Sequence, residues 1–392
     1  MLRLLPLLLL PTAALAQGAP VPQGPANAGY PPAFAEQTRA PALGSTAIST
    51  SVFADGLENP WGIAALPGGQ YLVTERPGRM RVITVDGGLS AEIGGLPQVD
   101  AREQGGLLDV AVGPDFASTR SVWWSYAKPV DGGSVTAVAT GTLAADWSEM
   151  TDVRDIWLQS PAVDTPQHYG SRLVFDGDGH LFITTGERSS ERNRVLSQDL
   201  DATYGKVIRI MPDGEVPADN PYVGTQGDGA IWSYGHRNIQ GAALHPQTGE
   251  LWTVEHGPAG GDELNQPMPG RNYGWPLVSY GVNYNGSALG EGQTSMEGVT
   301  EPVYYWDPVI APGGMLFYEG DAFAGWQGDL LIAGLNPGAL VRLEMQDGQV
   351  AGEEHLLTDI GRIRDVEEAA NGDLLLLIDD GNGAVIRVTP GS

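Results

Sequence analysis

Short stretches in which apolar and polar residues alternate recur along most of the chain. Each meets a turn rich in Gly, Asp, Pro or Asn, and a second, more continuously apolar stretch follows. Such a pair of strands around a tight turn predicts a β-hairpin. The six copies are Gly62-IAALPGGQYLVTE, Gly106-LLDVAVGPDF with SVWWSYA, Gly170-SRLVFDGDGHLFITTGE, Gly241-AALHPQTGELWTVEHG, Gly313-GMLFYEG with GDLLIAGL, and Arg364-DVEEAANGDLLLLID. Helix-like periodicity is weak throughout, so the pattern predicts an all-β chain.

Six hairpins joined by segments of strand length predict a six-bladed β-propeller of four-stranded antiparallel blades. Residues 47–53 are suited to pair with residues 384–389, which would close the ring and leave no open sheet edge. The copies are unequally spaced, which predicts insertions at residues 257–284 and 286–303. A two-sheet solenoid or a pair of β-sandwiches is the competing architecture.

The N-terminal residues 1–16 have the layout of a secretory signal peptide. Arg3 precedes an apolar stretch, and Ala14-Leu15-Ala16 forms the small-residue pattern of a cleavage site. The alternative is a short membrane anchor. Residues 17–44 are rich in Pro, Gly and Ala without apolar periodicity, so we expect a flexible lead. Residues 45–392 then form a single propeller domain that carries the catalytic site.

Composition narrows the possible functions. The 392 residues include 55 Gly and 29 Pro, which suits a folded, turn-rich protein. A formal net charge of −27 disfavours nucleic acid as a partner. No 18-residue apolar run follows the N-terminus, so we expect no membrane-spanning segment. Cysteine is absent, so any metal must be held by oxygen or His, and an exported chain without disulfides suggests the bacterial periplasm.

Unusual polar residues lie just before the repeats, where the innermost strands of a propeller start beside the axis. Taken singly, each is as well explained as a solvated surface residue. Four repeats agree, however, and together they predict a shared funnel with three cations, one neutral base and two amides. Because Arg binds carboxylates bidentately, the expected ligand is an anion with several carboxylates. The residues are Gln104, His168, Arg237, Asn238, Arg362 and Arg364.

His168 is the candidate general base of this funnel. A neutral imidazole near the axis would accept a proton from a substrate hydroxyl, which is the commonest role of His in catalysis. The alternatives are a structural hydrogen bond and a metal ligand. The other histidines form neither an HExxH nor an HxH pair, so zinc is disfavoured.

The loop 255–276 is a candidate calcium site. Gly257 and Pro258 offer adjacent carbonyls, and Asp262, Glu263 and Asn265 add oxygens near Tyr273. Ca²⁺ takes six to eight oxygen ligands, carbonyls included. The alternative is an acidic, Gly-rich surface loop, since the chain has no EF-hand pattern.

Several long runs resemble the periplasmic aldose sugar dehydrogenases of the glucose/sorbosone dehydrogenase family. They are EQGGLLDVAVGPDF, QHYGSRLVFDGDGHLFITTGE, IWSYGHRNIQGAALHPQTGELWTVEHGPAGGDELN, GRNYGWPLVSYGVNY and GRIRDVEEAANGDLLLLID. The likeness extends in order over residues 57–389. That family uses pyrroloquinoline quinone (PQQ) and Ca²⁺, and its fold is a six-bladed propeller.

The resemblance implies roles at matching positions. His168 would take the C1 hydroxyl proton of the sugar while hydride passes to PQQ. The carbonyls of Gly257 and Pro258 would carry the Ca²⁺ that polarises the quinone, and Glu263 and Tyr273 would hold a second Ca²⁺. The residues implied to hold or flank PQQ are Gln104, Arg237, Asn238, Tyr284, Pro312, Gly313, Arg362 and Arg364.

Two positions depart from the family pattern. Gln167 stands where glucose dehydrogenase members have an acidic residue beside the base, which implies altered sugar selectivity. Asn336 stands where many members have a Lys that binds the quinone. Losing a charged hydrogen bond there would cost about 1.5–3 kcal/mol if nothing compensates.

The resulting expectation is a periplasmic quinoprotein that oxidises aldoses to lactones, as a monomer or homodimer. Its electron acceptor is left open between a cytochrome, a quinone and an artificial dye. A Ca²⁺-dependent propeller lactonase is a second reading, although it would need acidic or Asn side chains on an axial metal. A non-catalytic propeller that binds sugar or protein is the third, and it would need neither a His base nor convergent arginines.

Overall fold

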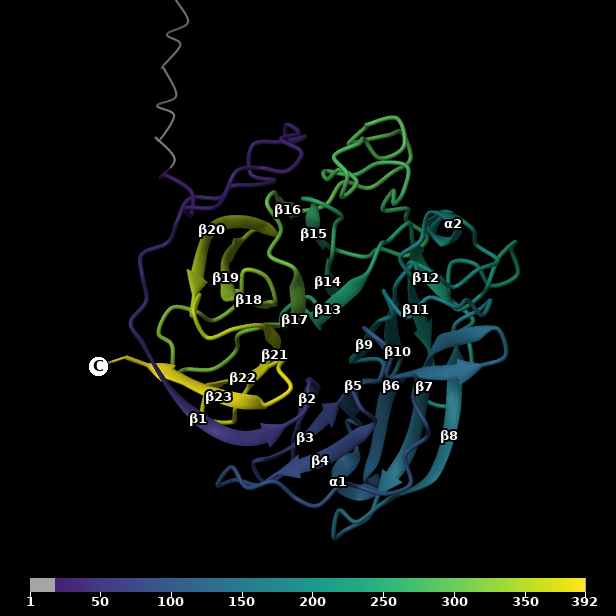
Figure 1. Ribbon diagram of the computed structural model, residues 1–392, viewed down its shortest axis with the longest axis vertical. Coiled ribbons are helices and arrows are strands. Elements are labelled where there is room, and N and C mark those ends of the chain that lie inside the picture. Colours follow the sequence, from purple (N-terminus) through teal and green to yellow (C-terminus); the bar gives the residue numbers. More distant parts are fainter. Residues whose placement is uncertain (1–17, 392) are drawn as a thin grey trace, which may run out of the picture.

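Six small antiparallel sheets stand in a ring in the computed structural model, which describes residues 18–391 (Figure 1). Each sheet is one blade, and the first strand of each repeat is its innermost strand. Every inner strand contacts the inner strands of the two neighbouring blades, so the ring is closed. The predicted six-bladed β-propeller is confirmed. Within residues 18–391, no helix is long and apolar enough to cross a membrane.

The first three blades follow one another along the chain. Blade 1 contains β2 (Pro60–Leu66), β3 (Gln70–Glu75) and β4 (Arg79–Ile83). Blade 2 contains β5 (Leu107–Val112), β6 (Ser121–Val130), β7 (Gly133–Leu143) and β8 (Met150–Leu158). Blade 3 contains β9 (Gly170–Phe175), β10 (Leu181–Thr185), β11 (Lys206–Ile210) and β12 (Ile231–Tyr234). The short helical pieces are α1 (Phe116–Thr119), α2 (Glu191–Arg194) and the 3₁₀ turn η1 (Val195–Ser197).

The remaining blades complete the ring. Blade 4 contains β13 (Ile239–Leu244), β14 (Leu251–Glu255), β15 (Asp262–Asn265) and β16 (Tyr304–Trp306). Blade 5 contains β17 (Pro312–Phe317), β18 (Leu330–Gly334), β19 (Ala339–Gln346) and β20 (Gln349–Leu356). Blade 6 contains β21 (Ile363–Glu368), β22 (Leu374–Ile378), β23 (Gly383–Pro390) and β1 (Ile48–Leu57).

Blade 1 has three strands, and an irregular segment covers its outer edge. The backbone N–H of Ser90 donates to the Val82 oxygen at 2.8 Å, and that of Ile93 donates to the Met80 oxygen at 2.9 Å. The segment therefore takes the place of a fourth strand beside β4 and satisfies part of its exposed edge.

The ring closes as the sequence predicts, through the pairing of β1 with β23. Ser49 lies opposite Thr389 and Val52 lies opposite Ile386 in antiparallel register. The pairing extends beyond the predicted segments, since Ile48 lies opposite Pro390 and Leu57 opposite Gly383. Blade 6 thus combines one strand from the start of the domain with three from its end.

The expectation of a flexible lead does not fit the contacts of residues 27–43. Gln37 is fully buried, and its Nε2 donates to the Pro302 oxygen at 3.0 Å. The Asp307 carboxylate accepts backbone N–H groups from residues 27–29. These contacts are polar and use the backbone, so apolar periodicity gave no sign of them. The predicted signal peptide, residues 1–16, lies outside the described residues.

The predicted insertion at residues 257–284 needs one correction. Asp262–Asn265 within it is strand β15, which pairs with both β14 and β16. This strand has four residues and only one aliphatic side chain, so alternation did not reveal it. The inserted loop is residues 266–303, which rises beyond the ring between β15 and β16 (Figure 1).

A buried ion-pair cluster joins the inner strands at the axis. Arg172 on β9 bonds through Nη1 to Asp109 Oδ1 on β5 at 2.7 Å and to Asp365 Oδ2 on β21 at 3.0 Å. Its Nε donates to the Gln240 carbonyl on β13 at 3.1 Å. Asp365 Oδ2 also accepts the backbone N–H of Ile63 on β2 at 3.2 Å. One guanidinium therefore connects five of the six inner strands, directly or through Asp365.

The sixth inner strand, β17, reaches the cluster only because it carries glycine there. A Cβ at Gly314 would lie 1.7 Å from Asp365 Oδ1 and 2.9 Å from Arg172 Nη2. A side chain at this position would displace the ion pair, so the close approach of the strand requires Gly.

We expect Arg172→Leu to lower the free energy of unfolding by about 3–5 kcal/mol, because it leaves two buried carboxylates without their cation. Urea denaturation followed by circular dichroism measures the loss. Arg154→Leu on the exposed face of β8 is the matched control, with an expected change within about 0.5 kcal/mol. Equal stability of the two variants would contradict a structural role for the axial cluster.

Candidate active site

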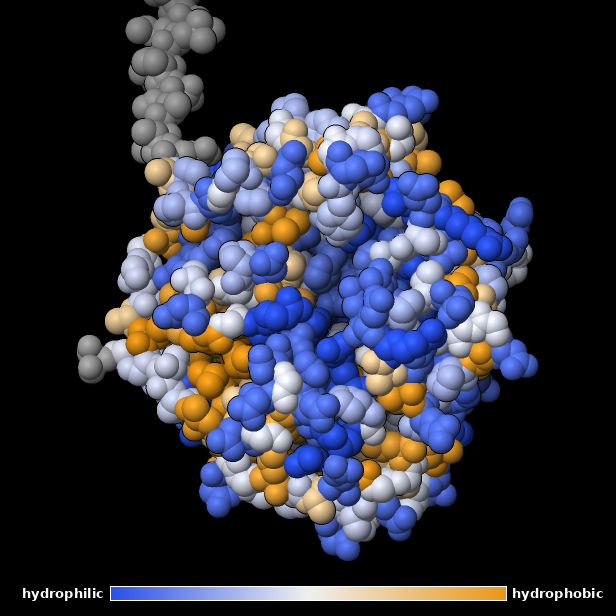
Figure 2. Space-filling model, viewed as in Figure 1, coloured by the Kyte–Doolittle hydropathy of each residue, from blue (hydrophilic) through white to orange (hydrophobic). Residues whose placement is uncertain are grey.

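A cavity of about 310 Å³ lies on the face of the ring where the inner strands begin. Figure 2 shows hydrophilic residues gathered around the hollow at the centre of the ring. The cavity is lined by all six polar residues predicted from the repeats, namely Gln104, His168, Arg237, Asn238, Arg362 and Arg364. The structure therefore brings together residues that are up to 260 positions apart in sequence (364 − 104).

His168 is buried, with 6% of its surface exposed, and a carboxylate orients its ring. Nδ1 lies 3.0 Å from Glu187 Oε1. Because a carboxylate only accepts hydrogen bonds, Nδ1 carries the proton and Nε2 is left as the acceptor. The backbone N–H of His168 donates to Gln104 Oε1 at 2.8 Å. This arrangement prepares Nε2 to take a proton from a group in the cavity.

The surroundings of His168 keep the imidazole neutral. Burial lowers its pKa, and the nearby Arg237 charge lowers it further. The hydrogen bond and charge of Glu187 raise the pKa and so act in the opposite direction. The net shift is downward, which leaves the ring unprotonated near neutral pH and suited to act as a base.

A second buried side chain fixes the loop that carries His168. Arg188 donates through Nε to the Gln167 carbonyl at 3.0 Å and through Nη1 to the Ser134 carbonyl at 2.8 Å. Its guanidinium lies over the Tyr169 ring, 4.0 Å from the centroid. His168 has a left-handed backbone with φ of 50°, which is unfavourable without Gly. The Arg188 bonds hold this strained turn in place.

The cavity is rich in guanidinium groups. Arg76 lines it together with the predicted Arg237, Arg362 and Arg364, against the carboxylates of Glu103 and Asp379. The Nε atoms of Arg237 and Arg364 are buried and have no hydrogen-bond partner within residues 18–391. Buried donors of this kind are normally satisfied. Their presence indicates a site built for a ligand with several acceptor groups.

Asp379 balances part of this charge. It pairs with Arg364 Nη2 at 2.7 Å and with Arg362 Nη2 at 3.4 Å. Burial by itself raises the pKa of Asp379, but Arg364, Arg76 and Arg362 outweigh it and bring the pKa to about 2. Asp379 is therefore ionised, and its ion pairs hold Arg362 and Arg364 in place.

His256 is a second, unpredicted imidazole in the cavity wall. It is half-buried near the charges of Arg237 and Arg364, and its Nε2 has no partner in the described part of the chain. Burial first, and then the charges of Arg237 and neighbouring groups, lower the pKa of His256 well below its usual range. It stays neutral beside the guanidinium groups.

The four predicted metal residues line one small adjoining cavity. Gly257, Pro258, Glu263 and Tyr273 share it with Arg237 and His256. The Gly257 carbonyl accepts Arg237 Nη1 at 2.6 Å, so a cation bound there would share this oxygen with Arg237. Asp262 is bonded elsewhere, because its carboxylate accepts the backbone N–H groups of Gly257, Ile310 and Ala311.

Glu263 lies opposite Glu255 on the neighbouring strand. Asn265 Nδ2 donates to both carboxylates, at 2.9 Å to Glu255 and 3.2 Å to Glu263. Burial and the charge of Glu255 raise the pKa of Glu263 well above its usual range. Asn265 Oδ1 is buried without a partner among residues 18–391. A carboxylate beside an unused amide oxygen offers oxygen donors of the kind that a hard cation takes.

Tyr273 contributes less than its sequence position suggests. Its hydroxyl donates to the Gln266 carbonyl and accepts the Met268 N–H at 3.0 Å. The phenol also stacks on His236 with ring centroids 4.6 Å apart. The side chain is already engaged, so only its backbone oxygen is available to a metal. No cluster of three or more His, Cys, Asp or Glu side chains that would hold a metal occurs within residues 18–391.

The residues that the resemblance implies beside PQQ do not all line the central cavity. Tyr284 is 78% exposed at the cavity, and its hydroxyl accepts Arg237 Nη2 at 3.4 Å. Pro312 and Gly313 start β17 and do not line the cavity. A Cβ at Gly313 would lie 2.3 Å from the Arg364 carbonyl, so this glycine lets β17 pack against the strand that carries Arg364. Asn336 is exposed, and its neighbour Leu335 lines the cavity instead.

A second set of lining or supporting residues was not predicted from the sequence. Each follows the second strand of its blade: Arg76 after β3, Glu187 after β10, His256 after β14, Leu335 after β18 and Asp379 after β22. In an antiparallel pair the second strand ends at the face where the first begins. The position just after each second strand could therefore have been used to predict these residues. Trp61, Glu103 and Gln240 were also missed.

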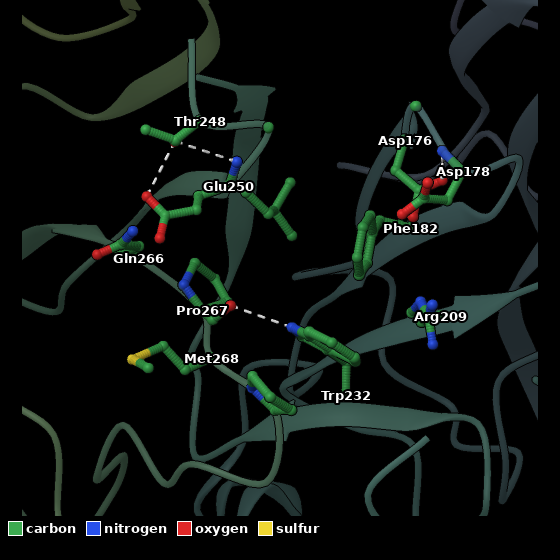
Figure 3. Close-up of a pocket in the computed structure, with 14 residues that line it drawn as sticks. Asp176, Asp178, Phe182, Arg209, Trp232, Thr248, Glu250, Gln266, Pro267 and Met268 are labelled. Atoms are coloured by element: carbon green, nitrogen blue, oxygen red, sulfur yellow. Dashed lines mark hydrogen bonds between the residues drawn. The ribbon is translucent and has the colours of Figure 1, made fainter. Parts of the chain in front are cut away.

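A larger cavity of about 510 Å³ lies between blades 3 and 4 (Figure 3). Its polar groups bond to one another: Trp232 Nε1 donates to the Pro267 carbonyl at 3.0 Å, and the Thr248 hydroxyl donates to Glu250 at 2.9 Å. No histidine lines it, and no buried donor that lines it lacks a partner among the described residues. The smaller central cavity is the candidate active site.

The chain is similar to known proteins over most of its length. A family model described as Glucose / Sorbosone dehydrogenase matches residues 57–387. The aldose sugar dehydrogenase YliI of Escherichia coli K12 is 43% identical over 348 residues, which cover 88% of this chain and 93% of that protein.

Solved structures show the same relationship. The apo form of the soluble aldose sugar dehydrogenase from Escherichia coli superposes with a TM-score of 0.84 at 43% identity, covering 88% of this chain and 99% of that one. The PQQ-bound aldose sugar dehydrogenase from Streptomyces coelicolor superposes with a TM-score of 0.72 at 28% identity, covering 89% and 99%.

We expect Glu187→Gln to lower the pKa of His168 further, because the carboxylate favours the protonated imidazole by charge and hydrogen bond. Titration of the ring nitrogens by NMR measures the shift. Glu149→Gln, on the exposed turn between β7 and β8, should leave the pKa of His168 unchanged. A pKa that stays the same or rises in Glu187→Gln would refute the assigned pairing.

Proposed function

The chain belongs to the glucose/sorbosone dehydrogenase family of oxidoreductases, and from this premise we propose that it oxidises the C1 hydroxyl of aldose sugars to lactones with PQQ and Ca²⁺. The observation that supports the proposal most is the central cavity, where an oriented neutral imidazole faces four guanidinium groups. A base next to an anion-binding wall suits removal of a hydroxyl proton beside a bound anionic cofactor.

The residues of the cavity fit PQQ, which carries three carboxylates. The unpartnered Nε atoms of Arg237 and Arg364 are donors for such groups, and Arg76 and Arg362 add further charge at the wall. Gln104 and Asn238 add amide groups. Charge-assisted bonds from guanidinium groups are strong and geometrically specific. When bound, PQQ supplies the two-electron acceptor for the hydride of the sugar.

The side chains of this chain account for the proton and for the charge. His168 Nε2 accepts the hydroxyl proton, and Glu187 stabilises the resulting imidazolium through Nδ1–H. The guanidinium groups favour negative charge that develops in the cavity during the reaction. Arg188 keeps the turn of His168 fixed, so the base is positioned before substrate arrives.

Two positions suit Ca²⁺. The carbonyls of Gly257 and Pro258 lie at the wall shared with the cavity, where a cation would act as a Lewis acid. The Glu263 carboxylate and Asn265 Oδ1 would hold a second, structural cation, next to Glu255, whose oxygens already accept bonds from His236, Arg237 and Asn265. A bound cation there would offset the repulsion of the two buried carboxylates.

The wider setting of the reaction is also part of the proposal. Residues 1–16 would direct the chain to the periplasm, and the protein would act there as a monomer or homodimer. The net charge of −27 would favour a basic redox carrier such as a cytochrome as electron acceptor, with a quinone or a dye as the alternatives.

The test is an anaerobic titration of signal-free, metal-stripped protein with PQQ and Ca²⁺, followed by addition of an aldose while the absorption spectrum is recorded. We expect about one PQQ per chain and rapid reduction by sugar. His168→Ala should bind PQQ equally well but be reduced roughly 10²–10⁴-fold more slowly, because the base is lost. His245→Ala on the turn between β13 and β14 is the control. Normal reduction of His168→Ala would eliminate the base role, and failure of the unaltered chain to bind PQQ would refute the proposal.

We expect Glu263→Ala to bind one Ca²⁺ fewer per chain, because the carboxylate that would hold the second cation is removed. Metal content after equilibration with Ca²⁺ and desalting, measured by atomic emission, tests this. Glu344→Ala, exposed on β19, should keep the full content. Unchanged stoichiometry in Glu263→Ala would remove the second metal site.

A further inference from the structure

The two carboxylates that line the central cavity are engaged differently. Asp379 is paired with Arg364 and Arg362. Glu103 accepts one hydrogen bond, from Gln167 Nε2 at 2.6 Å, and it forms no ion pair within residues 18–391. Glu103 is exposed at the mouth of the cavity, so its carboxylate oxygens can accept further hydrogen bonds from a ligand that enters the cavity.

The backbone of Glu103 is held in an unfavourable conformation. Its φ of 44° is left-handed, which costs free energy in a residue with a side chain. Arg76 donates through Nη1 to the Glu103 carbonyl, and the next residue, Gln104, donates its N–H to the Pro166 carbonyl at 3.1 Å. These two bonds tie the turn to blade 1 on one side and to the His168 loop on the other. Strain maintained in this way at a cavity mouth indicates a functional position.

The contact with Gln167 places this carboxylate beside the base. Gln167 directly precedes His168, and its backbone carbonyl is fixed by Arg188. Its side-chain amide donates a hydrogen bond to Glu103. The acidic group at this end of the cavity therefore comes from the loop that precedes blade 2. The sequence alone had suggested that an acidic group beside the base was missing.

We infer that Glu103 is a specificity-determining residue for the sugar, and this inference rests on the proposed function. Its carboxylate accepts hydrogen bonds from hydroxyls of a neutral aldose held with C1 near His168. The same charge disfavours sugars that carry a carboxylate, such as hexuronates. The substrate class assigned to the site is therefore neutral aldoses, with uronates rejected by charge at the mouth.

The test compares glucose and glucuronate as substrates of the PQQ- and Ca²⁺-loaded protein and its Glu103→Gln variant. Glutamine keeps the size and the contact with Gln167 but removes the charge. We expect the KM for glucose to rise roughly 5- to 10-fold with kcat changed less than about threefold, since a charged hydrogen bond is replaced by a neutral one. The relative rate with glucuronate should rise, PQQ binding should be unchanged, and Glu103→Asp should recover part of the selectivity.

A second readout does not depend on turnover. Saturation-transfer NMR with the cofactor-free protein reports binding of each sugar, and the glucuronate signal relative to glucose should increase in Glu103→Gln. Glu149→Gln, far from the cavity, is the control for both measurements. If the unaltered chain turns over aldoses but Glu103→Gln shows the same KM and the same sugar preference, this inference is wrong. If the unaltered chain is reduced by no aldose, the proposed function itself fails.

Discussion

The guanidinium of Arg172 at the axis is the interaction on which the ring depends. Burying one cation between two carboxylates is costly unless all three are held in close contact. The packing of six inner strands provides this, including the glycine of β17 that makes room for Asp365. The guanidinium carbon of Arg172 lies over the ring of Trp61, 4.7 Å from the ring centroid. Trp61 also lines the central cavity. The ion pair that joins the blades thus also supports the floor of the site.

Blade topology explains the composition of the cavity. Each inner strand begins, and each second strand ends, at the same face, so two short segments per blade deliver side chains to one place. Blade 3 delivers His168 with its carboxylate partner Glu187, and blade 4 delivers His256, while blades 1 and 6 deliver Arg76, Arg362, Arg364 and Asp379. Arg237, which precedes β13 of blade 4, extends the anion-binding wall to the neighbourhood of the base.

The sequence predicted the parts of the molecule that repeat. Alternation and turns identified six blades, and matching positions before the repeats identified all six polar residues that meet in the cavity. It did not predict residues whose position follows from strand pairing, such as Glu187 and His256. It also missed β15, which is short and mostly polar, and the packing of residues 27–43, which uses backbone bonds. Gln167 suggested that an acidic group beside the base was absent, because its hydrogen-bond partner Glu103 is 64 residues away in sequence.

The closure of the ring has a consequence for how the molecule is made. Blade 6 needs β1 from residues 48–57 and β23 from residues 383–390, so its sheet is complete only after nearly the whole domain is available. Until then β1 and β22 both present open edges, and β21, the last inner strand around Arg172, belongs to an incomplete sheet. A chain that emerges residue by residue from a ribosome or a membrane channel therefore cannot close its ring until β23 is available.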